Sequence, residues 1–529
     1  MTLEERAAAL ASAHWPIRRP RARSGPLADL RALSAAIERA TRGFQISRAE
    51  DPRYKKAAEW FLDNHYLIAR TLRQIRKEIP AGFRRRLPFV AGDHLPRVLR
   101  IAQALVESTN LDFDEPTLLT FVEAYQTGSS LAIAELWALP AMLRIATLAT
   151  LVQSLDVFFV PDRATSPDSQ PEPAGGVERS VRVLRLLAEI DWKSFFQRTS
   201  AVEAALRDDP SGTYARMDFR ARDAYRKIVE RCAWNTQRSE PEVARLAVAL
   251  AADRAGDPRE GHVGYYLVDR GQEQLKRCIG YRAHGRERVR GVVLAHPTLA
   301  YLGGIGAVSL LTLGLTARVA WPTFGFGMTA IACSLLIVPF SSIAVAFVNW
   351  CTSRLLVPRL LPKLDFAEAV PADCRTAVVI PALVKSREDF DRLFAQLEQH
   401  YLSTPDPSVA FALLTDYVDS KEKPDDRDIL AHAEEVVRRL NEKYAAAPSC
   451  PFHVLHREAK WNEAEGCFMG WERKRGKLEE FNRRLRGDRT TSFKHHFGDS
   501  VGLDGIRFVI TLDADTRLPI GAARRLIGL

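Results

Sequence analysis

"RFVITLDADTRLP", residues 507–519, is the stretch that decides how the C-terminal third of the chain is interpreted. Its apolar run FVITL holds β-branched and aromatic residues without helical spacing, which predicts a buried strand. Side chains alternate along a strand, so Asp513 and Asp515 are expected to point the same way. Two carboxylates on one side of a strand tip favour a divalent cation, Mg²⁺ or Mn²⁺, held together with substrate phosphates. The alternative is a solvated turn whose aspartates cap the helix predicted for "IGAARRLIGL".

The segments before this stretch alternate between predicted strands and predicted helices. "TAVVIP", "VAFALLTDYV" and "FHVLHRE" have strand patterns, and helical patterns such as "DDRDILAHAEEVVRRLNEKYA" separate them. This alternation predicts a mainly parallel sheet, in which ligands bind beyond the carboxyl ends of the strands. Asp416 and Asp419 lie at the end of the second strand, and Asp513 and Asp515 at the end of the fourth. The acidic residues therefore gather at the expected ligand-binding edge, which favours the metal-site hypothesis over the turn.

The order "VVIP…LLTDYVDS…RGKLEEFN…TLDADT" resembles nucleotide-sugar glycosyltransferases of the GT-A type, which have a Rossmann-type parallel sheet. The resemblance implies that Asp513 and Asp515 form a metal-binding DxD motif, with Mg²⁺ or Mn²⁺ bridging the two phosphates of the nucleotide-sugar. It also implies that Asp416 contacts the nucleoside and that Lys477 steadies phosphate as a point charge. The alternatives are an ordinary strand-end aspartate for Asp416 and a solvated helix face for Lys477, because "ERKRGKLEE" is charged all round.

The chain of 529 residues is too long for one ordinary core, so several regions are expected. Its seven cysteines show no CxxC pair, which favours reduced thiols over a disulfide framework. Helical spacing dominates the first half and is interrupted by "PDRATSPDSQPEPAGG", which is rich in Pro, Ser and Gly. The predicted regions are a basic flexible arm (1–45), a helical region (46–160), a linker (161–176), a second helical region (177–290), two transmembrane helices (292–350) and the N-terminal part of a GT-A-like domain (372–529).

Two apolar stretches, 292–321 and 322–350, follow the second helical region. The first holds one charged residue, Arg318, and the second holds none. Each is long enough to cross a bilayer core of about 30 Å, which takes about 20 residues. Trp321 and Trp350 end the two stretches, as interfacial anchors do, and this argues against the alternative of a buried helical hairpin in a soluble core.

Basic segments flank this pair of stretches on both sides, "KRCIGYRAHGRERVRG" before it and "RLLVPRLLPK" after it. Lys and Arg beside a span favour the cytoplasmic side, so the N-terminal region and the α/β region are both expected in the cytoplasm. These flanks attract anionic membrane lipid and explain part of the net charge of +10. Nucleic acid is therefore not expected as a partner.

Longer strings give a closer resemblance, to the cyclic β-1,2-glucan synthases of Gram-negative bacteria. They are "SSLAIAELWALPAMLR", "YARMDFRARDAYRKIVE", "HVGYYLVDRGQEQL", "EAEGCFMGWERKRGKLEEFNRRLRG" and "RFVITLDADTRLPIGAARRLIG", in the family's order from about residue 50. The resemblance implies a multi-pass protein of the bacterial inner membrane. It implies an enzyme that transfers glucose from UDP-glucose to a growing β-1,2-glucan chain, with inversion and with a metal ion.

The sequence departs from the family by ending in the helix after the DxD motif. The resemblance places the general base beyond Leu529, together with the rest of the transferase domain and the region that processes the glucan. We therefore expect residues 1–529 alone to insert into the membrane without making glucan. The competing hypothesis is a catalytically inactive membrane scaffold that at most binds nucleotide-sugar.

Overall fold

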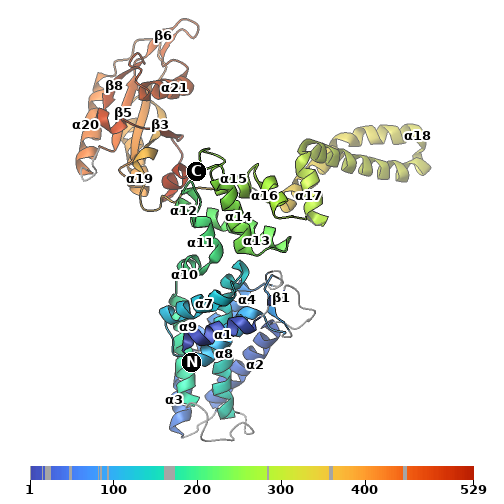
Figure 1. Cartoon of the computed structure of the whole chain (residues 1–529). Helices are drawn as coiled ribbons and strands as arrows, with labels where there is room; N and C mark the ends of the chain where they lie inside the picture. Colours follow the sequence, from blue (N-terminus) through green and yellow to red (C-terminus); the bar gives the residue numbers. More distant parts are fainter. Residues whose placement is uncertain are drawn as a thin grey trace. The chain divides into compact units, whose positions relative to one another are not determined.

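The computed structural model describes most of the chain, and every statement below concerns that part. The described residues are 2–14, 16–17, 26–46, 51–80, 83, 86–91, 94–159, 173–282, 285–356, 361–444 and 450–529. The chain forms two compact units, one made of Met1–Ala215 with Ala224–Leu355 and one made of Arg216–Asp223 with Leu356–Leu529 (Figure 1). Each unit is described by itself. The predicted linker at 161–176 lies outside the described residues up to 172, and helix α9 begins at Pro173.

The first unit is almost entirely helical, with one short antiparallel pair of strands, β1 (Pro16–Ile17) and β2 (Phe89–Val90). The helices up to the apolar hairpin are α1 (Leu3–Ala13), α2 (Pro26–Ile46), α3 (Pro52–Asp63), α4 (His65–Glu78), α6 (Arg97–Thr109), α7 (Glu115–Gly128), α8 (Ile133–Phe159), α9 (Pro173–Glu189), α10 (Trp192–Thr199), α11 (Ala201–Arg207), α12 (Thr213–Arg216), α13 (Phe219–Trp234), α14 (Glu240–Ala252), α15 (Val263–Val268), α16 (Gln272–Cys278) and α17 (Gly285–Ala295). Residues Arg216–Asp223 count with the second unit, where the Asp218 amide donates to the Lys363 carbonyl at 2.9 Å.

The N-terminal segment is helical where we expected a flexible basic arm over 1–45. Helix α1 begins with a reciprocal capping box, in which the Glu5 amide donates to Thr2 Oγ1 at 3.1 Å and the Thr2 amide donates to Glu5 Oε2 at 2.8 Å. Ala7 and Ala11 are buried, and α1 packs on α7. The expectation was wrong because alanine is the strongest helix former, and its small side chain allows close helix packing.

Helix α8 is the central core helix of the first unit. It is long and apolar enough to cross a membrane, but 56% of its most apolar window is buried within the protein. It continues through Pro140, although proline inside a helix usually kinks or ends it. Two carboxylate–guanidinium pairs fix its place: in a buried pair, Arg97 Nε donates to Glu135 Oε1 at 2.8 Å, and in a partly exposed pair, Arg144 Nη1 donates to Glu78 Oε2 at 2.8 Å.

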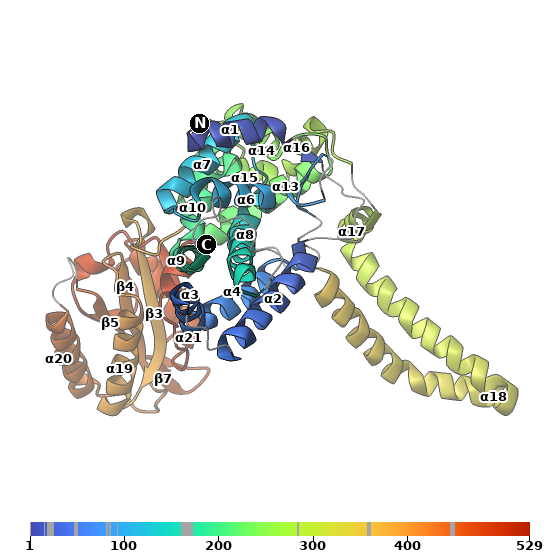
Figure 2. The ribbon, with the colours of Figure 1, turned by 90° about the horizontal axis from the view of Figure 1, so that it is seen from below.

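Helix α18 (Pro297–Leu355) contains the two predicted apolar stretches. Gly325 has φ 69° and ψ 179°, which breaks the helix into two arms that run antiparallel to each other (Figures 1 and 2). The Tyr301 hydroxyl donates to Asn349 Oδ1 at 2.9 Å, so the open ends of the two arms are joined. Only 6% of the most apolar window is buried, in contrast to α8. An exposed apolar surface of this extent is typical of a segment that meets lipid or another protein.

The second unit is built on a five-stranded mixed sheet. Its strand order is β8-β5-β4-β3-β9, with β5, β4, β3 and β9 parallel and β8 antiparallel at one edge. A separate hairpin, β6–β7, leads from the sheet to α21. The elements are β3 (Thr376–Val384), α19 (Arg387–Ser403), β4 (Val409–Tyr417), α20 (Arg427–Lys443), β5 (Phe452–Arg457), β6 (Lys460–Asn462), β7 (Cys467–Met469), α21 (Arg473–Leu485), β8 (Phe493–Phe497), β9 (Phe508–Thr511) and α22 (Ala522–Ile527).

Alternating residues of the central strands supply two separate cores. Val378 and Ile380 face the core that α19 and α20 close, whereas Ala377 and Val379 face the core that contains Phe481 of α21. The sheet therefore lies between α19 and α20 on one face and α21 on the other. All the parallel strands end at the same edge, and the loops after them lie together there.

Both edge strands of the sheet are partly exposed. His495 and His496 belong to β8, whose pattern of buried and exposed residues suits an edge strand. The run FVITL was expected to be fully buried, but Phe508 is 50% exposed and Val509 and Ile510 are half-buried. The reason is that β9 pairs only with β3 and is the other edge of the sheet.

Candidate functional site

The carboxyl edge of the sheet carries a buried pair of opposite charges on its two central strands. Register places Thr415 of β4 opposite His456 of β5, so Asp416 and Arg457 come side by side one residue later. Arg457 Nε donates to Asp416 Oδ1 at 2.6 Å, and its Nη2 donates to Asp416 Oδ2 at 2.7 Å. Both side chains are buried, at 0% and 2% exposed. This is the planar, two-bond geometry that makes an arginine–carboxylate pair strong and directional.

Lys477 joins this pair from the opposite side, out of the second turn of α21. Its Nζ lies 3.1 Å from Asp416 Oδ2 and donates to the Ala382 carbonyl of β3 at 2.6 Å. Its side chain is 2% exposed. Burial lowers the pKa of Lys477 to about 8, against the opposing effect of the Asp416 carboxylate. The predicted residues Asp416 and Lys477 are thus in direct contact, although they lie 61 positions apart in the sequence.

The structure places Asp416 inside the protein, bound to two cations. Direct contact with a nucleoside, which the sequence resemblance implies for this residue, stays a prediction. What the geometry provides is a fixed anionic point that holds Lys477 at the ends of β3 and β4. Asp416 and Lys477 are both buried and paired. They are therefore neither an aspartate of a solvated turn nor a lysine on a solvated helix face, which were the alternatives.

Helix α21 begins with an unusual turn. Glu472 and Arg473 have φ values of 51° and 46°, in the left-handed region that residues other than glycine seldom adopt. Two glycines flank the turn at points of close approach: a Cβ on Gly470 would lie 2.7 Å from Asp416 Oδ2, and a Cβ on Gly476 would lie 2.2 Å from the Trp471 carbonyl oxygen. The turn therefore depends on these small residues, and it directs the first turn of α21 toward the carboxyl edge.

The two aspartates of the DxD motif lie beyond the end of β9, which stops at Thr511. They belong to a turn closed by a hydrogen bond from the Thr516 amide to the Asp513 carbonyl at 2.9 Å. The argument that they share one face of a strand therefore does not apply. Both are exposed, and the Asp513 carboxylate pairs with Lys474 Nζ from the first turn of α21.

The loop after the motif is fastened to α19. Gln396 Nε2 donates to the Thr516 carbonyl at 2.9 Å, and the Leu518 amide lies 3.4 Å from His400 Nδ1. Burial lowers the pKa of His400, which favours the neutral ring that can accept this bond. The carboxylates of the motif are thus free to meet solvent while the segment behind them is held.

The chemistry of this loop fits a hard divalent cation. Mg²⁺ is commonly bound by one or two carboxylates together with substrate phosphates. The Lys474 ammonium on Asp513 shows that a cation can reach this carboxylate. Within the described ranges, no group of three or more His, Cys, Asp or Glu side chains is arranged to hold a metal ion. A cation at Asp513 and Asp515 would therefore depend on further oxygen atoms, such as those of a ligand.

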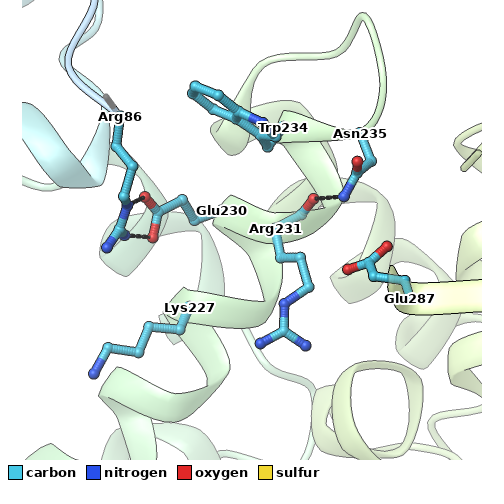
Figure 3. Close-up of a pocket in the computed structure, with 7 residues that line it drawn as sticks. All are labelled: Arg86, Lys227, Glu230, Arg231, Trp234, Asn235 and Glu287. Carbon is cyan, nitrogen blue, oxygen red and sulfur yellow. Dashed lines mark hydrogen bonds and ion pairs between the residues drawn. The ribbon is translucent and has the colours of Figure 1, made fainter. Parts of the chain in front are cut away.

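A second concave feature lies in the first unit, between α13 and α17 (Figure 3). It is a cavity of about 460 Å³ lined by Arg86, Lys227, Glu230, Arg231, Trp234, Asn235 and Glu287. Arg86 Nε donates to Glu230 Oε1 at 2.7 Å, so one carboxylate and one cation neutralise each other. Trp234 is 42% exposed at its rim. This cavity is a competing candidate for ligand binding.

A parallel α/β sheet with charged residues at its carboxyl edge defines a class of fold that binds small ligands there. No protein-family model matches the chain. The chain is 30% identical, over 557 aligned residues, to the cyclic beta-(1,2)-glucan synthase NdvB of Rhizobium meliloti (strain 1021). The alignment covers 89% of this chain and 20% of that relative, so the chain spans about a fifth of the relative's length. This similarity supports membership of the chain in the cyclic β-(1,2)-glucan synthase family, as a partial region of such a protein.

Sequence reasoning singled out Asp416, Lys477 and the DxD pair as candidates but did not consider Arg457. Its signal was present: "FHVLHRE" is an apolar strand that ends in an arginine at the same edge as Asp416. An arginine at the end of a buried strand requires a carboxylate partner, because an unpaired buried charge is costly. Asp416 ends the strand before it in the chain, and was the obvious candidate.

Proposed function

We propose that the chain is part of a membrane glycosyltransferase that transfers glucose from UDP-glucose to a growing β-1,2-glucan. The observation that carries this proposal is the similarity to NdvB along nearly the whole chain. The charged carboxyl edge of the sheet supports it, since a nucleotide-sugar needs cationic groups for its phosphates and a fixed pocket at such an edge.

The donor site is proposed at the carboxyl ends of β3, β4 and β9. Mg²⁺ or Mn²⁺, when bound by Asp513 and Asp515, would stabilise charge on the departing UDP. Lys474 projects from the first turn of α21, where the helix dipole also favours phosphate, and the buried Lys477 adds positive charge behind it. Asp416 fixes the position of Lys477 and so helps to orient the nucleotide. The transfer is proposed to invert the anomeric configuration, with a general base that deprotonates the acceptor hydroxyl.

The two arms of α18 are proposed to span the bacterial inner membrane, in contact with lipid. Their exposed apolar side chains include Leu310, Leu311, Leu335 and Val338, each at least 70% exposed. Basic residues flank the hairpin on both sides in the sequence, which favours the cytoplasm for both the helical region and the α/β unit. UDP-glucose is a cytosolic type of donor, so this orientation gives the α/β unit access to it.

Binding of UDP-glucose to the purified chain in detergent tests the proposal. Isothermal titration should show binding with Mn²⁺ and a large loss of affinity with EDTA, because the ion connects the diphosphate to the motif. ADP-glucose should bind more weakly if the site reads the base. Absence of UDP-glucose binding, or equal binding with EDTA, would favour the alternative of a membrane scaffold over a donor site.

A further inference from the structure

Arg457 is buried at the centre of the charged edge, and every one of its donors has an acceptor. Besides its two bonds to Asp416, Nη1 donates to the Trp471 carbonyl at 2.9 Å and to Glu480 Oε2 at 3.2 Å, and Nη2 donates to the Arg473 carbonyl at 3.0 Å. A guanidinium has five N–H groups, and these five bonds use them all. Its side chain is 0% exposed, so it has neither a free donor nor a free surface for a ligand.

Two of these acceptors are backbone carbonyls on either side of Glu472. Glu472 and Arg473 are the two residues of this turn with positive φ, so Arg457 holds the strained turn at both its ends. The turn converts the chain leaving β7 into the first turn of α21. The place of Lys474 and Lys477 relative to the sheet therefore depends on bonds made by a side chain of β5.

The same guanidinium also connects the turn to Asp416 of β4. Asp416 in turn holds Lys477, and Lys477 holds the Ala382 carbonyl of β3. Two cations and two carboxylates, including Glu480, form one buried and balanced cluster across β3, β4, β5 and α21. Glu480 is itself fixed by the Ser492 amide, which donates to its Oε1 at 3.1 Å. A displacement of Arg457 would move the carboxylate and the helix start together.

We propose that Arg457 is the positioning residue of the donor site: it sets the first turn of α21 against the carboxyl edge, so that the exposed Lys474 meets the diphosphate of a nucleotide-sugar while Lys477 stays held beside Asp416. The inference rests on the proposed function. Arg457 touches neither metal nor ligand and acts through the groups it holds. Lysine cannot replace it, because a single ammonium cannot bond the carboxylate at two points and two carbonyls as well.

The test compares the full chain with Arg457→Lys, and uses Arg483→Lys as the matched control. Arg483 lies on α21, the helix that Arg457 is proposed to position, and pairs with Asp488 at 2.6 Å, but its side chain is 46% exposed. Arg457→Lys should weaken UDP-glucose binding about tenfold or more in Mn²⁺, as expected for loss of charge-assisted hydrogen bonds. Its affinity for Mn²⁺, measured at saturating UDP-glucose, should not change, because Arg457 does not touch the DxD loop. Arg483→Lys should alter neither affinity.

A ligand-free readout separates this inference from the proposed function. Amide hydrogen exchange should accelerate in the segment 470–478 of Arg457→Lys and stay unchanged there in Arg483→Lys. If Arg457→Lys does not fold, Gly470→Ala serves instead, since a Cβ there would lie 2.6 Å from Arg457 Nη2 and crowd the same cluster without changing its charge.

Each outcome bears on one claim. Unchanged exchange in 470–478 together with UDP-glucose affinity within twofold of wild type overturns the positioning role. Failure of the wild-type chain to bind UDP-glucose overturns the proposed function, and faster exchange in the variant would still support the structural role of Arg457 in the turn. An equal loss of Mn²⁺ and UDP-glucose affinity would also overturn the inference, because it would indicate general loosening of the unit.

Discussion

Replacing Gly476 with alanine tests the account of the α21 turn through the sign of its effect. Within a helix this change normally stabilises by about 1 kcal/mol, because glycine has the larger entropy in the unfolded chain. At position 476 the new Cβ would lie 2.2 Å from the Trp471 carbonyl oxygen and 2.7 Å from Trp471 Cε3. Ordinary contact needs about 3.4 Å, so the carbonyl would have to move by roughly 1 Å.

That movement breaks the bond from Arg457 Nη1 to the Trp471 carbonyl, now 2.9 Å. A hydrogen bond to a charged group contributes about 1.5–3 kcal/mol, which exceeds the gain in helix propensity. Gly476→Ala should therefore lower the local free energy of opening of α21 by about 0.5–2 kcal/mol. The measurement is native-state amide hydrogen exchange of α21 in the full chain.

The control lies on the exposed face of the same helix. The free energy of opening of α21 should be about 1 kcal/mol higher in Glu479→Ala than in Glu479→Gly. This difference gives the normal preference for alanine over glycine in this helix. If Gly476→Ala also raises protection, the Trp471 carbonyl is not held where we describe it, and the role assigned to the turn is wrong.

Three further predictions follow from other parts of the chain. Asp513→Asn or Asp515→Asn should weaken Mn²⁺-dependent binding of UDP-glucose at least tenfold without loss of folding by circular dichroism, and wild-type affinity in both variants would return the motif to an ordinary turn. Burial lowers the pKa of His453 to about 4, so as the pH falls this residue is protonated in the unfolded chain before it is protonated in the folded chain. Stability of the α/β unit should fall by roughly 3 kcal/mol between pH 6.5 and 4, and His453→Gln should flatten that loss in urea titrations followed by tryptophan fluorescence. If the stability of the wild type and of His453→Gln fell in parallel with pH, the role assigned to His453 would be wrong. Topology reporters inserted at Asp257 and at Pro424 should both read cytoplasm, whereas opposite sides would contradict the two-arm span of α18.

The sequence predicted the central strands well because their signal is local. The patterns at 376–381, 409–418 and 452–458 correspond closely to β3, β4 and β5, which are buried on both faces and read as continuous apolar runs. The edge strand β8 was missed, because "FKHHF" is short, partly exposed and polar, and only its pairing with β5 makes it a strand.

The site was predictable in part for the same reason. Strand ends marked Asp416 and the DxD pair, but the strand-face argument for Asp513 and Asp515 failed because β9 ends before them. The contact of Asp416 with Arg457 depends on the register of β4 against β5, which is a tertiary property. Lys477 reaches the same carboxylate only because two residues adopt positive φ at the start of α21, and no local pattern signals that conformation.

Photoaffinity labelling of the full chain with 5-azido-UDP-glucose in Mn²⁺ tests most directly whether the carboxyl edge of the sheet is the donor site. Mass spectrometry of the digested protein gives the labelled peptides, and excess UDP-glucose gives the control for specificity. The account predicts competed label in peptides that contain 382–386, 416–420 or 470–478. Competed label in the α13 peptide that contains Trp234 would instead assign the nucleotide-sugar to the cavity of the helical unit, and would contradict the donor site proposed here.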